Sequence, residues 1–223
     1  MARQVTDPPV TDERRVAMTY EEWLAWPAGE HTLSEWVDGE VTIFMPPSER
    51  HQYIAGFLFV LTSWYARALN LGEVIIAPFE MRLSPRSSRE PDLLFVAREH
   101  ANRLTGKRLE GPADLIVEII SEGSVTRDQR EKMTEYEAAG VREYWLVDAR
   151  PGHEETRFFQ RTATGAFAAI PPDAGGRYHA AALPGFWFRP EWLWLDPRPD
   201  PVMLLPTIAP DAWQRALATV RPS

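Results

Sequence analysis

Two carboxylates in strand-like segments are the residues of this sequence whose type and spacing best suit chemistry. Asp92 opens an apolar segment directly after Pro91, and Glu118 stands inside Leu-Ile-Val-Glu-Ile-Ile, the most apolar segment of the chain. Because burying an unpaired carboxylate is costly, a metal ion, an Arg or a Lys should face Glu118. Carboxylate oxygens on rigid elements are typical ligands of hard divalent cations, so the pair predicts hydrolytic metal chemistry.

Lysine is scarce in this chain, which gives Lys132 particular weight. The 24 basic residues include only two lysines, Lys107 and Lys132. Asp128 and Lys132 stand four residues apart in a predicted helix and so share a face. Each candidate has a structural alternative: Lys132 could be a solvated partner of Asp128, Glu118 could pair with a buried Arg, and Asp92 could end its strand.

The periodicity of apolar residues predicts the elements that must position these side chains. Thr19-Tyr20-Glu21-Glu22 matches the capping box of a short helix, and Asp38-Gly39 is a strong hairpin-turn signal. The predicted order is the hairpin 32–45, a helix over 48–70, strands over 73–83, 92–97 and 113–120, a helix over 124–139, a strand over 142–148, strands over 156–160 and 166–170, and a helix near 211–220. This order predicts a mixed α/β (α+β) domain.

Composition limits the classes of protein that the sequence can belong to. The chain has 223 residues, a formal net charge of −8 and no cysteine, which removes disulfides, zinc–thiolate sites and thiol nucleophiles. Its apolar runs fall far short of the roughly 20 residues that cross a bilayer, and residues 1–17 do not resemble a secretory signal. We therefore expect a cytoplasmic protein that does not bind nucleic acid by bulk charge alone.

Three segments are expected along the chain: a flexible arm over 1–17, a domain over 18–196, and a Pro-rich extension with a short helix over 197–223. Near the end of the domain, Trp187, Trp192 and Trp194 suggest a packed or dimer-facing patch. Together with the hairpin, this patch predicts a homodimer.

Seven stretches of the sequence resemble the Uma family of bacterial restriction-endonuclease-like proteins, within the PD-(D/E)XK nuclease superfamily. They are Met-Thr-Tyr-Glu-Glu-Trp-Leu (18–24), Val-Asp-Gly-Glu-Val (37–41), Met-Pro-Pro-Ser-Glu-Arg-His (45–51), Pro-Asp-Leu-Leu-Phe-Val (91–96), Asp-Leu-Ile-Val-Glu-Ile-Ile-Ser (114–121), Arg-Asp-Gln-Arg-Glu-Lys-Met-Thr-Glu-Tyr (127–136) and Gly-Val-Arg-Glu-Tyr-Trp-Leu-Val-Asp (140–148). The resemblance extends from about residue 18 to residue 196. It implies a restriction-endonuclease-like core, helix-strand-strand-strand-helix-strand, preceded by a helix and a hairpin.

The resemblance also implies a role for individual residues. Asp92 and Glu118, with the backbone carbonyl of Ile119, would hold one Mg²⁺ or Mn²⁺, and Glu40 would complete the acidic cluster. The superfamily's lysine normally lies two residues after the Glu, where this chain has an isoleucine. Lys132 would take that place from the following helix, orient the attacking water and offset phosphate charge.

The activity that the resemblance implies is hydrolysis of DNA phosphodiester bonds by metal-activated water, without an organic cofactor. The candidate contacts to DNA are His51, Arg127 and Arg130, with Arg82, Arg86 and Arg89 as further arginines near the site in sequence. For His51 the favoured interpretation is a polar residue at a helix start, and Glu80 ranks below Glu40 as an acidic group. Two alternatives stay open: a non-catalytic dimeric binding protein on a nuclease-like scaffold, and an RNA-directed nuclease.

Overall fold

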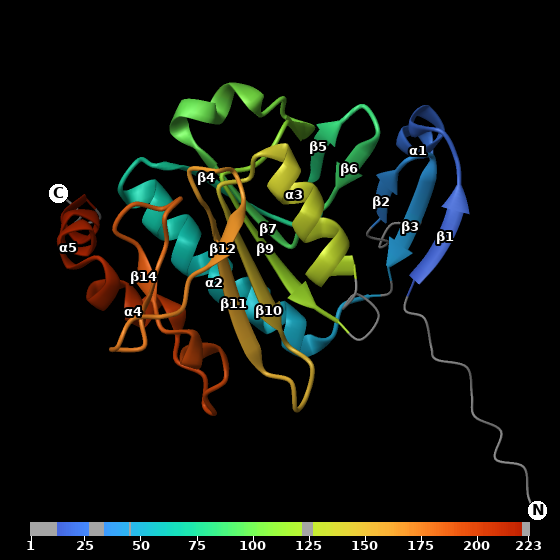
Figure 1. Cartoon of the computed structure of the whole chain (residues 1–223). Coiled ribbons are helices and arrows are strands. Elements are labelled where there is room, and N and C mark those ends of the chain that lie inside the picture. Colours follow the sequence, from blue (N-terminus) through green and yellow to red (C-terminus); the bar gives the residue numbers. More distant parts are fainter. Residues whose placement is uncertain (1–12, 27–33, 45, 122–126, 220–223) are drawn as a thin grey trace, which may run out of the picture.

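Two six-stranded sheets form the frame of the protein in a computed structural model that describes residues 13–26, 34–44, 46–121 and 127–219. The central sheet has the order β12-β11-β10-β9-β7-β4. Its strands are β4 (Gly72–Ile76), β7 (Leu93–Ala97), β9 (Leu115–Ile120), β10 (Glu143–Asp148), β11 (Glu155–Arg161) and β12 (Phe167–Ala169). Only β9 and β10 run parallel to each other, and their crossover carries α3 (Met133–Ala139) (Figure 1).

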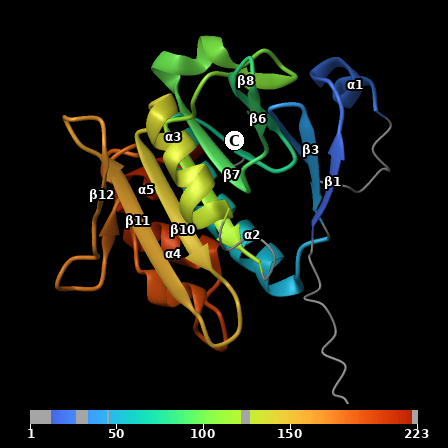
Figure 2. The same cartoon turned by 45° about the vertical axis from the view of Figure 1, so that its right-hand side comes forward.

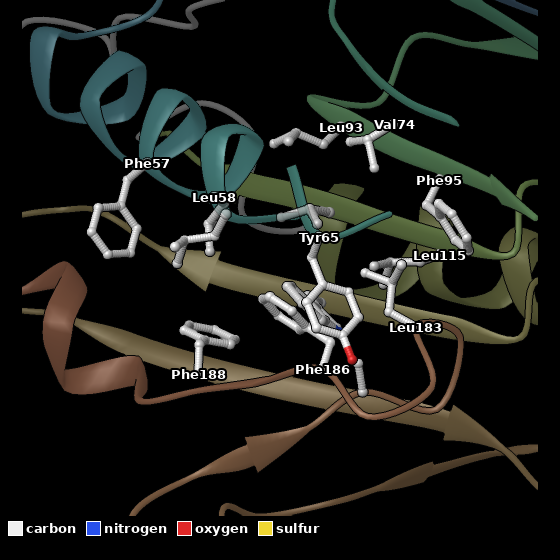
Figure 3. Close-up of a cluster of buried hydrophobic side chains, with 14 of the residues drawn as sticks. Phe57, Leu58, Tyr65, Val74, Leu93, Phe95, Leu115, Leu183, Phe186 and Phe188 are labelled. Carbon is white, nitrogen blue, oxygen red and sulfur yellow. The ribbon is translucent and has the colours of Figure 1, made fainter. Parts of the chain in front are cut away.

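The central sheet is buried on both faces because its middle strands are almost entirely apolar. Odd-numbered residues of β7 and β9 pack toward α2 (Glu49–Ala68) in the larger core, part of which Figure 3 shows. Even-numbered residues of the same strands pack toward α3 in a second core. Since side chains alternate along a strand, residue parity alone decides which helix a side chain of β9 meets. The second core lies on the side of α3, and Glu118 points into it.

Helix α2 begins and ends as its sequence predicts. The Ser48 side chain accepts a hydrogen bond of 3.2 Å from the His51 backbone N–H, which satisfies one of the free donors of the first turn. Residues such as Ile54, Leu58 and Leu61, spaced by three and four, are fully buried against the central sheet. The helix therefore fixes the position of its first turn, including His51, relative to β7.

The second sheet, here called the hairpin sheet, stands at one end of the molecule (Figure 2). Its order is β1-β3-β2-β6-β5-β8. Its strands are β1 (Glu13–Ala17), β2 (Ser34–Val37), β3 (Glu40–Phe44), β5 (Glu80–Ser84), β6 (Ser87–Arg89) and β8 (Arg108–Glu110). The predicted turn Asp38-Gly39 joins β2 to β3 with positive φ at both residues. On the face that Trp36 and Val41 share, α1 (Tyr20–Ala25) closes a small third core.

The structure corrects two boundaries predicted at the N-terminal half. The single strand expected over 73–83 is two strands, β4 and β5, which lie in different sheets because Pro78 interrupts the run and lacks an N–H to donate. Residues Glu13–Ala17, expected within a flexible arm, form β1 and pair with β3. The predicted helix over 124–139 consists, in its described part, of a π-helical turn at Arg127–Lys132 followed by α3.

The C-terminal segment packs on the larger core and is not a separate extension. It contains β13 (Tyr178–His179), β14 (Trp187–Phe188), a 3-10 turn at Pro190–Leu193, α4 (Pro201–Ile208) and α5 (Pro210–Thr219). Buried Glu143 at the start of β10 anchors it, because its carboxylate accepts hydrogen bonds from the Tyr178 hydroxyl and from the Ala182 N–H at 2.6 Å. Another 3-10 turn, Arg98–Arg103, follows β7. None of the described helices combines the length and the apolar character needed to span a membrane.

Two glycines give a matched prediction about packing. A Cβ on Gly72 would lie 2.1 Å from the carbonyl oxygen of Val96, so Gly72→Ala should force β4 away from β7 and lower the free energy of unfolding by about 2 kcal/mol or more. A Cβ on Gly56, within α2, meets nothing within 4 Å. Gly56→Ala should instead raise stability by about 0.5–1 kcal/mol through helix propensity. Urea unfolding of both variants tests this, and equal effects would contradict it.

Candidate active site

Glu118 is a carboxylate inside the second core, and two side chains from one helical face compensate it. It lies on β9 beside Leu146 of β10, with only 5% of its side chain exposed. Lys132 Nζ stands 2.9 Å from Glu118 Oε1, and the Tyr136 hydroxyl donates to the same oxygen at 2.7 Å. Lys132 and Tyr136 are four residues apart and so reach Glu118 from the same side of the helix. The lysine is therefore a buried partner of Glu118, and the expectation of a solvated lysine is wrong.

A second carboxylate, from the hairpin sheet, reaches the same lysine. Glu35 of β2 is 1% exposed, and its Oε1 lies 2.9 Å from Lys132 Nζ. Its other oxygen, Oε2, lies 3.0 Å from Arg89 Nη1 on β6. Arg89 Nη2 in turn contacts Glu135 Oε2 at 2.7 Å, and the Ser87 hydroxyl also donates to Glu135. Glu135 follows Lys132 by three residues, so three ion pairs and this stretch of helix backbone link four side chains of alternating charge, here called the charge ring: Glu35, Arg89, Glu135 and Lys132.

Asp92 directly precedes the first residue of β7 and lies next to the Glu118–Ile119 peptide. The antiparallel register Leu93↔Val117 continues to Asp92 opposite Glu118. The Ile119 N–H donates to Asp92 Oδ2 at 2.7 Å, which fixes the carboxylate at this edge of β9. The two carboxylates that the sequence singles out are therefore held on adjacent strands at facing positions.

His51 borders Asp92 from the other side of the central sheet. Its Nε2 lies 3.2 Å from Asp92 Oδ1, and its place in the first turn of α2 makes this contact possible. Side-chain exposure rises from 1% at Glu35 and 5% at Glu118 to 14% at Asp92. Solvent therefore meets this cluster at Asp92 and the first turn of α2, and on the far side at Glu135, which is 22% exposed.

The charges of the cluster shift several pKa values. Burial would raise the pKa of Glu35, but Lys132 and Arg89 outweigh it and hold the carboxyl below its ordinary value. Burial lowers the pKa of Arg89, yet Glu35 and Glu135 raise it above its ordinary value, so the guanidinium stays charged. Burial and the charge of Glu118 raise the pKa of Tyr136 well above its ordinary value, which keeps the phenol a neutral hydrogen-bond donor.

Glu90 predicts a measurable dependence of stability on pH. Burial and the neighbouring Glu35 charge raise its pKa from 4.5 to about 7. Between these values the folded chain binds a proton that the unfolded chain has lost, so this contribution weakens as pH rises from about 4.5 to 7, by about 2 to 3 kcal/mol. In metal-free buffer, Glu90→Gln should match the wild type near pH 4.5 and exceed its unfolding free energy by about 2 kcal/mol at pH 8.

Urea titrations at both pH values test this prediction. Glu73→Gln provides the control, because Glu73 is 54% exposed and pairs with Arg67 on the surface. An unchanged pH dependence in Glu90→Gln would contradict the prediction.

Of the residues predicted from sequence, four meet in this cluster: Asp92, Glu118, Lys132 and His51. Glu40 does not join them. It occupies the same face of the hairpin sheet as Glu35, but its carboxylate is 47% exposed and pairs with Arg15 at 3.1 Å. Glu35 is the hairpin carboxylate that reaches the cluster. It lies on β2, two residues before Val37, which pairs with Glu40.

The predicted arginine contacts separate into different environments. Arg89 is buried in the charge ring, while Arg86 pairs with Asp38 on the surface at 2.6 Å. The guanidinium of Arg82 stacks 3.5 Å from the Tyr20 ring centroid. Arg130 is exposed on the π-helical turn, and the side chain of Arg127 lies outside the described residues.

Glu80 faces away from the cluster. Its carboxylate accepts hydrogen bonds from the Tyr20 hydroxyl at 2.6 Å and the Ser88 hydroxyl at 2.7 Å. Both partners belong to the outer face of the hairpin sheet, which α1 covers, and the strand register places Arg89 on the opposite face. Glu80 is therefore not an acidic group of this site.

Sequence reasoning missed Glu35 and Tyr136. Tyr136 carried a usable signal, since it follows Lys132 by four residues and must share its helical face. Glu35 carried none, because a glutamate between Ser34 and Trp36 in a hairpin strand is ordinary on an exposed sheet face. Its role depends on how the hairpin sheet packs against the Lys132 helix, and local sequence patterns do not predict that packing.

The donor set of this cluster fits a hard divalent cation. Asp92 and Glu118 offer carboxylate oxygens at facing positions, and the Ile119 peptide lies between them. Among the residues that the structure describes, no group of three or more His, Cys, Asp and Glu side chains could hold a metal. A cation here would use two carboxylates and complete its coordination with backbone oxygen and water, which is the usual habit of Mg²⁺ and not of structural zinc.

Comparison with known proteins places the chain in a family. A family model described as "Uma2: Putative restriction endonuclease" matches residues 20–192. The chain belongs to the Uma2 family. The match includes the hairpin sheet strands that carry Glu35 and Arg89, as well as Asp92, Glu118 and Lys132, and it confirms the resemblance that the sequence motifs carry.

A solved structure shares the fold of this Uma2-family chain. It is the crystal structure of a "putative nuclease belonging to DUF820" from Anabaena variabilis ATCC 29413, with a TM-score of 0.64. The similarity covers 79% of this chain and 97% of that chain at 15% sequence identity, which establishes a common fold. The mixed α+β, nuclease-like fold class predicted from the sequence is thereby confirmed. No curated protein sequence matches this chain.

Proposed function

We propose that this Uma2-family protein is a metal-dependent endonuclease that hydrolyses phosphodiester bonds of DNA. The observation that carries the proposal is the arrangement of Asp92 and Glu118 on adjacent strands, with Lys132 Nζ 2.9 Å from Glu118. Paired carboxylates beside a buried ammonium suit phosphoryl transfer, in which catalysis is mostly positioning and charge stabilisation. Family membership and the shared nuclease-like fold support the same reaction class.

Charge within the cluster also favours a cation. Among the side chains that the structure describes around the site, carboxylates outnumber the fixed cations: Glu35, Glu90, Asp92, Glu118 and Glu135 stand against Arg89 and Lys132. An excess of partly buried negative charge is unfavourable unless protons or a cation offset it. Mg²⁺ or Mn²⁺ is the expected ion, because oxygen is the only donor type that Asp92, Glu118 and the Ile119 carbonyl provide.

Each residue has a distinct task in the proposed reaction. The bound cation would polarise the scissile phosphate and make a water molecule acidic enough to attack phosphorus. Asp92 and Glu118, with the carbonyl of Ile119, would hold that cation, and Lys132 would orient the attacking water and offset phosphate charge. Water oxygen then bonds to phosphorus as the bond from phosphorus to the 3′-oxygen breaks, leaving a 5′-phosphate and a 3′-hydroxyl. His51, whose Nε2 lies 3.2 Å from Asp92 Oδ1, is the candidate contact to the phosphate.

Cleavage assays with and without divalent ions test the proposal. The purified chain is incubated with single-stranded, duplex and branched DNA and with matched RNA, in Mg²⁺, in Mn²⁺ or in EDTA. We expect DNA cleavage in either metal, none in EDTA, and a melting temperature that rises with metal concentration. Cleavage of RNA alone would establish the RNA-directed alternative, and neither cleavage nor metal stabilisation would reject the enzyme.

The non-catalytic alternative rests on the fact that a fold does not dictate function, and its dimer rests on the hairpin and on the tryptophan patch. Trp192 is buried, and the partly buried Trp187 and Trp194 pack against the larger core of the same chain, which favours a packed patch over a dimer-facing one. A homodimer stays a prediction that analytical ultracentrifugation decides. A cytoplasmic location likewise stays a prediction, tested by cell fractionation.

A further inference from the structure

Lys132 lies at the end of a helical turn, so its ammonium is held less firmly by the backbone than that of a lysine within β9 would be. A lysine two residues after Glu118 would sit in the ladder of the central sheet, but that position holds Ile120. Lys132 instead ends a π-helical turn and must cross the second core on a flexible four-carbon stem. Fixing that stem requires partners on the elements that it faces.

Glu118 alone is a poor anchor for this ammonium. Its Oε1 is shared by Lys132 Nζ and the Tyr136 hydroxyl. In the proposed reaction the same carboxylate also holds the cation, which competes with the ammonium for its negative charge. A second carboxylate that takes no part in metal binding would keep Nζ in place when Glu118 engages the cation.

Glu35 has the contacts and the burial that such an anchor needs. Oε1 of Glu35 lies 2.9 Å from Lys132 Nζ and accepts the Glu90 N–H at 3.2 Å, while Oε2 lies 3.0 Å from Arg89 Nη1. Both oxygens are thus engaged by the protein, and the side chain is 1% exposed. Glu35 therefore cannot meet substrate, and any effect on the reaction must pass through the groups that it contacts: Lys132, Arg89 and the Glu90 backbone.

The charge ring ties this anchor back to the helix that carries the lysine. Arg89 contacts Glu35 and Glu135 at once, and Glu135 follows Lys132 by one helical turn. A shift of the helix along its axis would break both the Lys132–Glu35 and the Arg89–Glu135 contacts. The hairpin sheet consequently sets the register of the helix against Glu118.

We propose that Glu35 is a positioning residue of the proposed nuclease site: it holds the Lys132 ammonium beside Glu118 so that Glu118 is free to bind the cation. This inference rests on the proposed function for its catalytic consequence. The hold of Glu35 on Lys132, in contrast, is a property of the folded chain and is measurable without any substrate.

The scarcity of lysine makes that measurement direct. The chain has only two lysines, and Lys107 is exposed whereas Lys132 is 3% exposed. Acetylation of the native protein with acetic anhydride, followed by peptide mass analysis, reports both ε-amines in one sample, with Lys107 as the internal standard. In the wild type, Lys132 should react at least about 100-fold more slowly than Lys107.

Glu35→Gln keeps the size of the side chain and removes its charge. It should raise the Lys132 reaction rate about 10-fold, the factor expected when one charge-assisted hydrogen bond is lost, and leave the Lys107 rate unchanged. Glu73→Gln, an exposed carboxylate paired with Arg67, should change neither rate. If Glu35→Gln does not fold, Glu35→Asp serves instead, because it keeps the charge and withdraws the carboxylate from Nζ by one methylene. A Lys132 rate equal to that of the wild type in a folded Glu35 variant overturns the inference.

Kinetics provide the second readout. With metal saturating, Glu35→Gln should lower kcat about 10- to 100-fold with KM within about twofold, since the lost interaction acts on the transition state and not on substrate binding. Unchanged kcat in a cleaving enzyme would refute the catalytic role of the anchor. If the wild type cleaves no nucleic acid, the proposed function fails, and the labelling comparison still decides whether Glu35 holds Lys132.

Discussion

Asp92→Asn is expected to lower kcat for nucleic-acid cleavage by about 1,000-fold or more and to remove the rise in melting temperature that Mg²⁺ or Mn²⁺ causes. The variant should keep its fold, because the Asn carbonyl can still accept the Ile119 N–H that now donates to Asp92 at 2.7 Å. What it loses is the negative charge opposite Glu118 that would bind the cation. Calorimetric melting over a metal titration and single-turnover cleavage assays measure the two effects.

A matched control comes from another Pro-Asp dipeptide of the same chain. Asp211 also follows a proline, but it lies exposed in the first turn of α5, on the C-terminal segment. Asp211→Asn should cleave like the wild type and show the same metal stabilisation. If Asp92→Asn retains metal stabilisation and activity comparable to this control, Asp92 is not a metal ligand and the proposed site is wrong.

Arg89→Met is expected to destabilise the protein by about 3–5 kcal/mol, the largest loss of stability that we predict for a single side chain of the site. Arg89 is 8% exposed and contacts two carboxylates, Glu35 at 3.0 Å and Glu135 at 2.7 Å. Methionine fills a similar volume but compensates neither charge, so the partly buried Glu135 would lose its cation and the buried Glu35 would keep only Lys132.

Arg86→Met, three residues earlier in the chain, separates the effect of burial from the loss of an ion pair. Arg86 also pairs with a carboxylate, Asp38, at 2.6 Å, but its side chain is 79% exposed. Surface pairs of this kind contribute little, so the change should stay within about 0.5 kcal/mol. Urea unfolding of both variants at one pH gives the comparison, and similar losses at the two positions would show that the charge ring adds nothing to stability.

Much of this structure could be predicted from local sequence patterns. The capping serine and the spacing of Ile54, Leu58 and Leu61 identify α2, and Asp38-Gly39 identifies the hairpin. The continuous apolar run around Glu118 marks a strand that is buried on both faces. The burial of an acidic residue there predicted a positively charged partner, and that partner is the Lys132 ammonium. These features depend on residues within a turn or two of one another, so sequence shows them directly.

The sequence could not show which segments meet in space. Lys132 contacts Glu35 across nearly one hundred residues, and no spacing rule relates a hairpin strand to a helix at that distance. For the same reason the sequence pointed to Glu40 and gave no sign of Glu35, although Glu35 is the one that contacts buried Lys132. Pro78 shows a different limit, because a proline signals a break in a strand but not that the next strand joins another sheet.

The way in which the C-terminal segment completes the larger core has a consequence for synthesis of the chain. Leu205, Ile208 and Ala212 belong to the core that also holds α2 and the odd-numbered side chains of β9, as the position of α4 and α5 beside α2 shows (Figure 1). On the ribosome, the strands that carry Asp92 and Glu118 emerge well before these residues. Their α2-facing side therefore stays incompletely covered until about ninety further residues have been made, so the final packing of these strands in the larger core follows translation of the C-terminal helices.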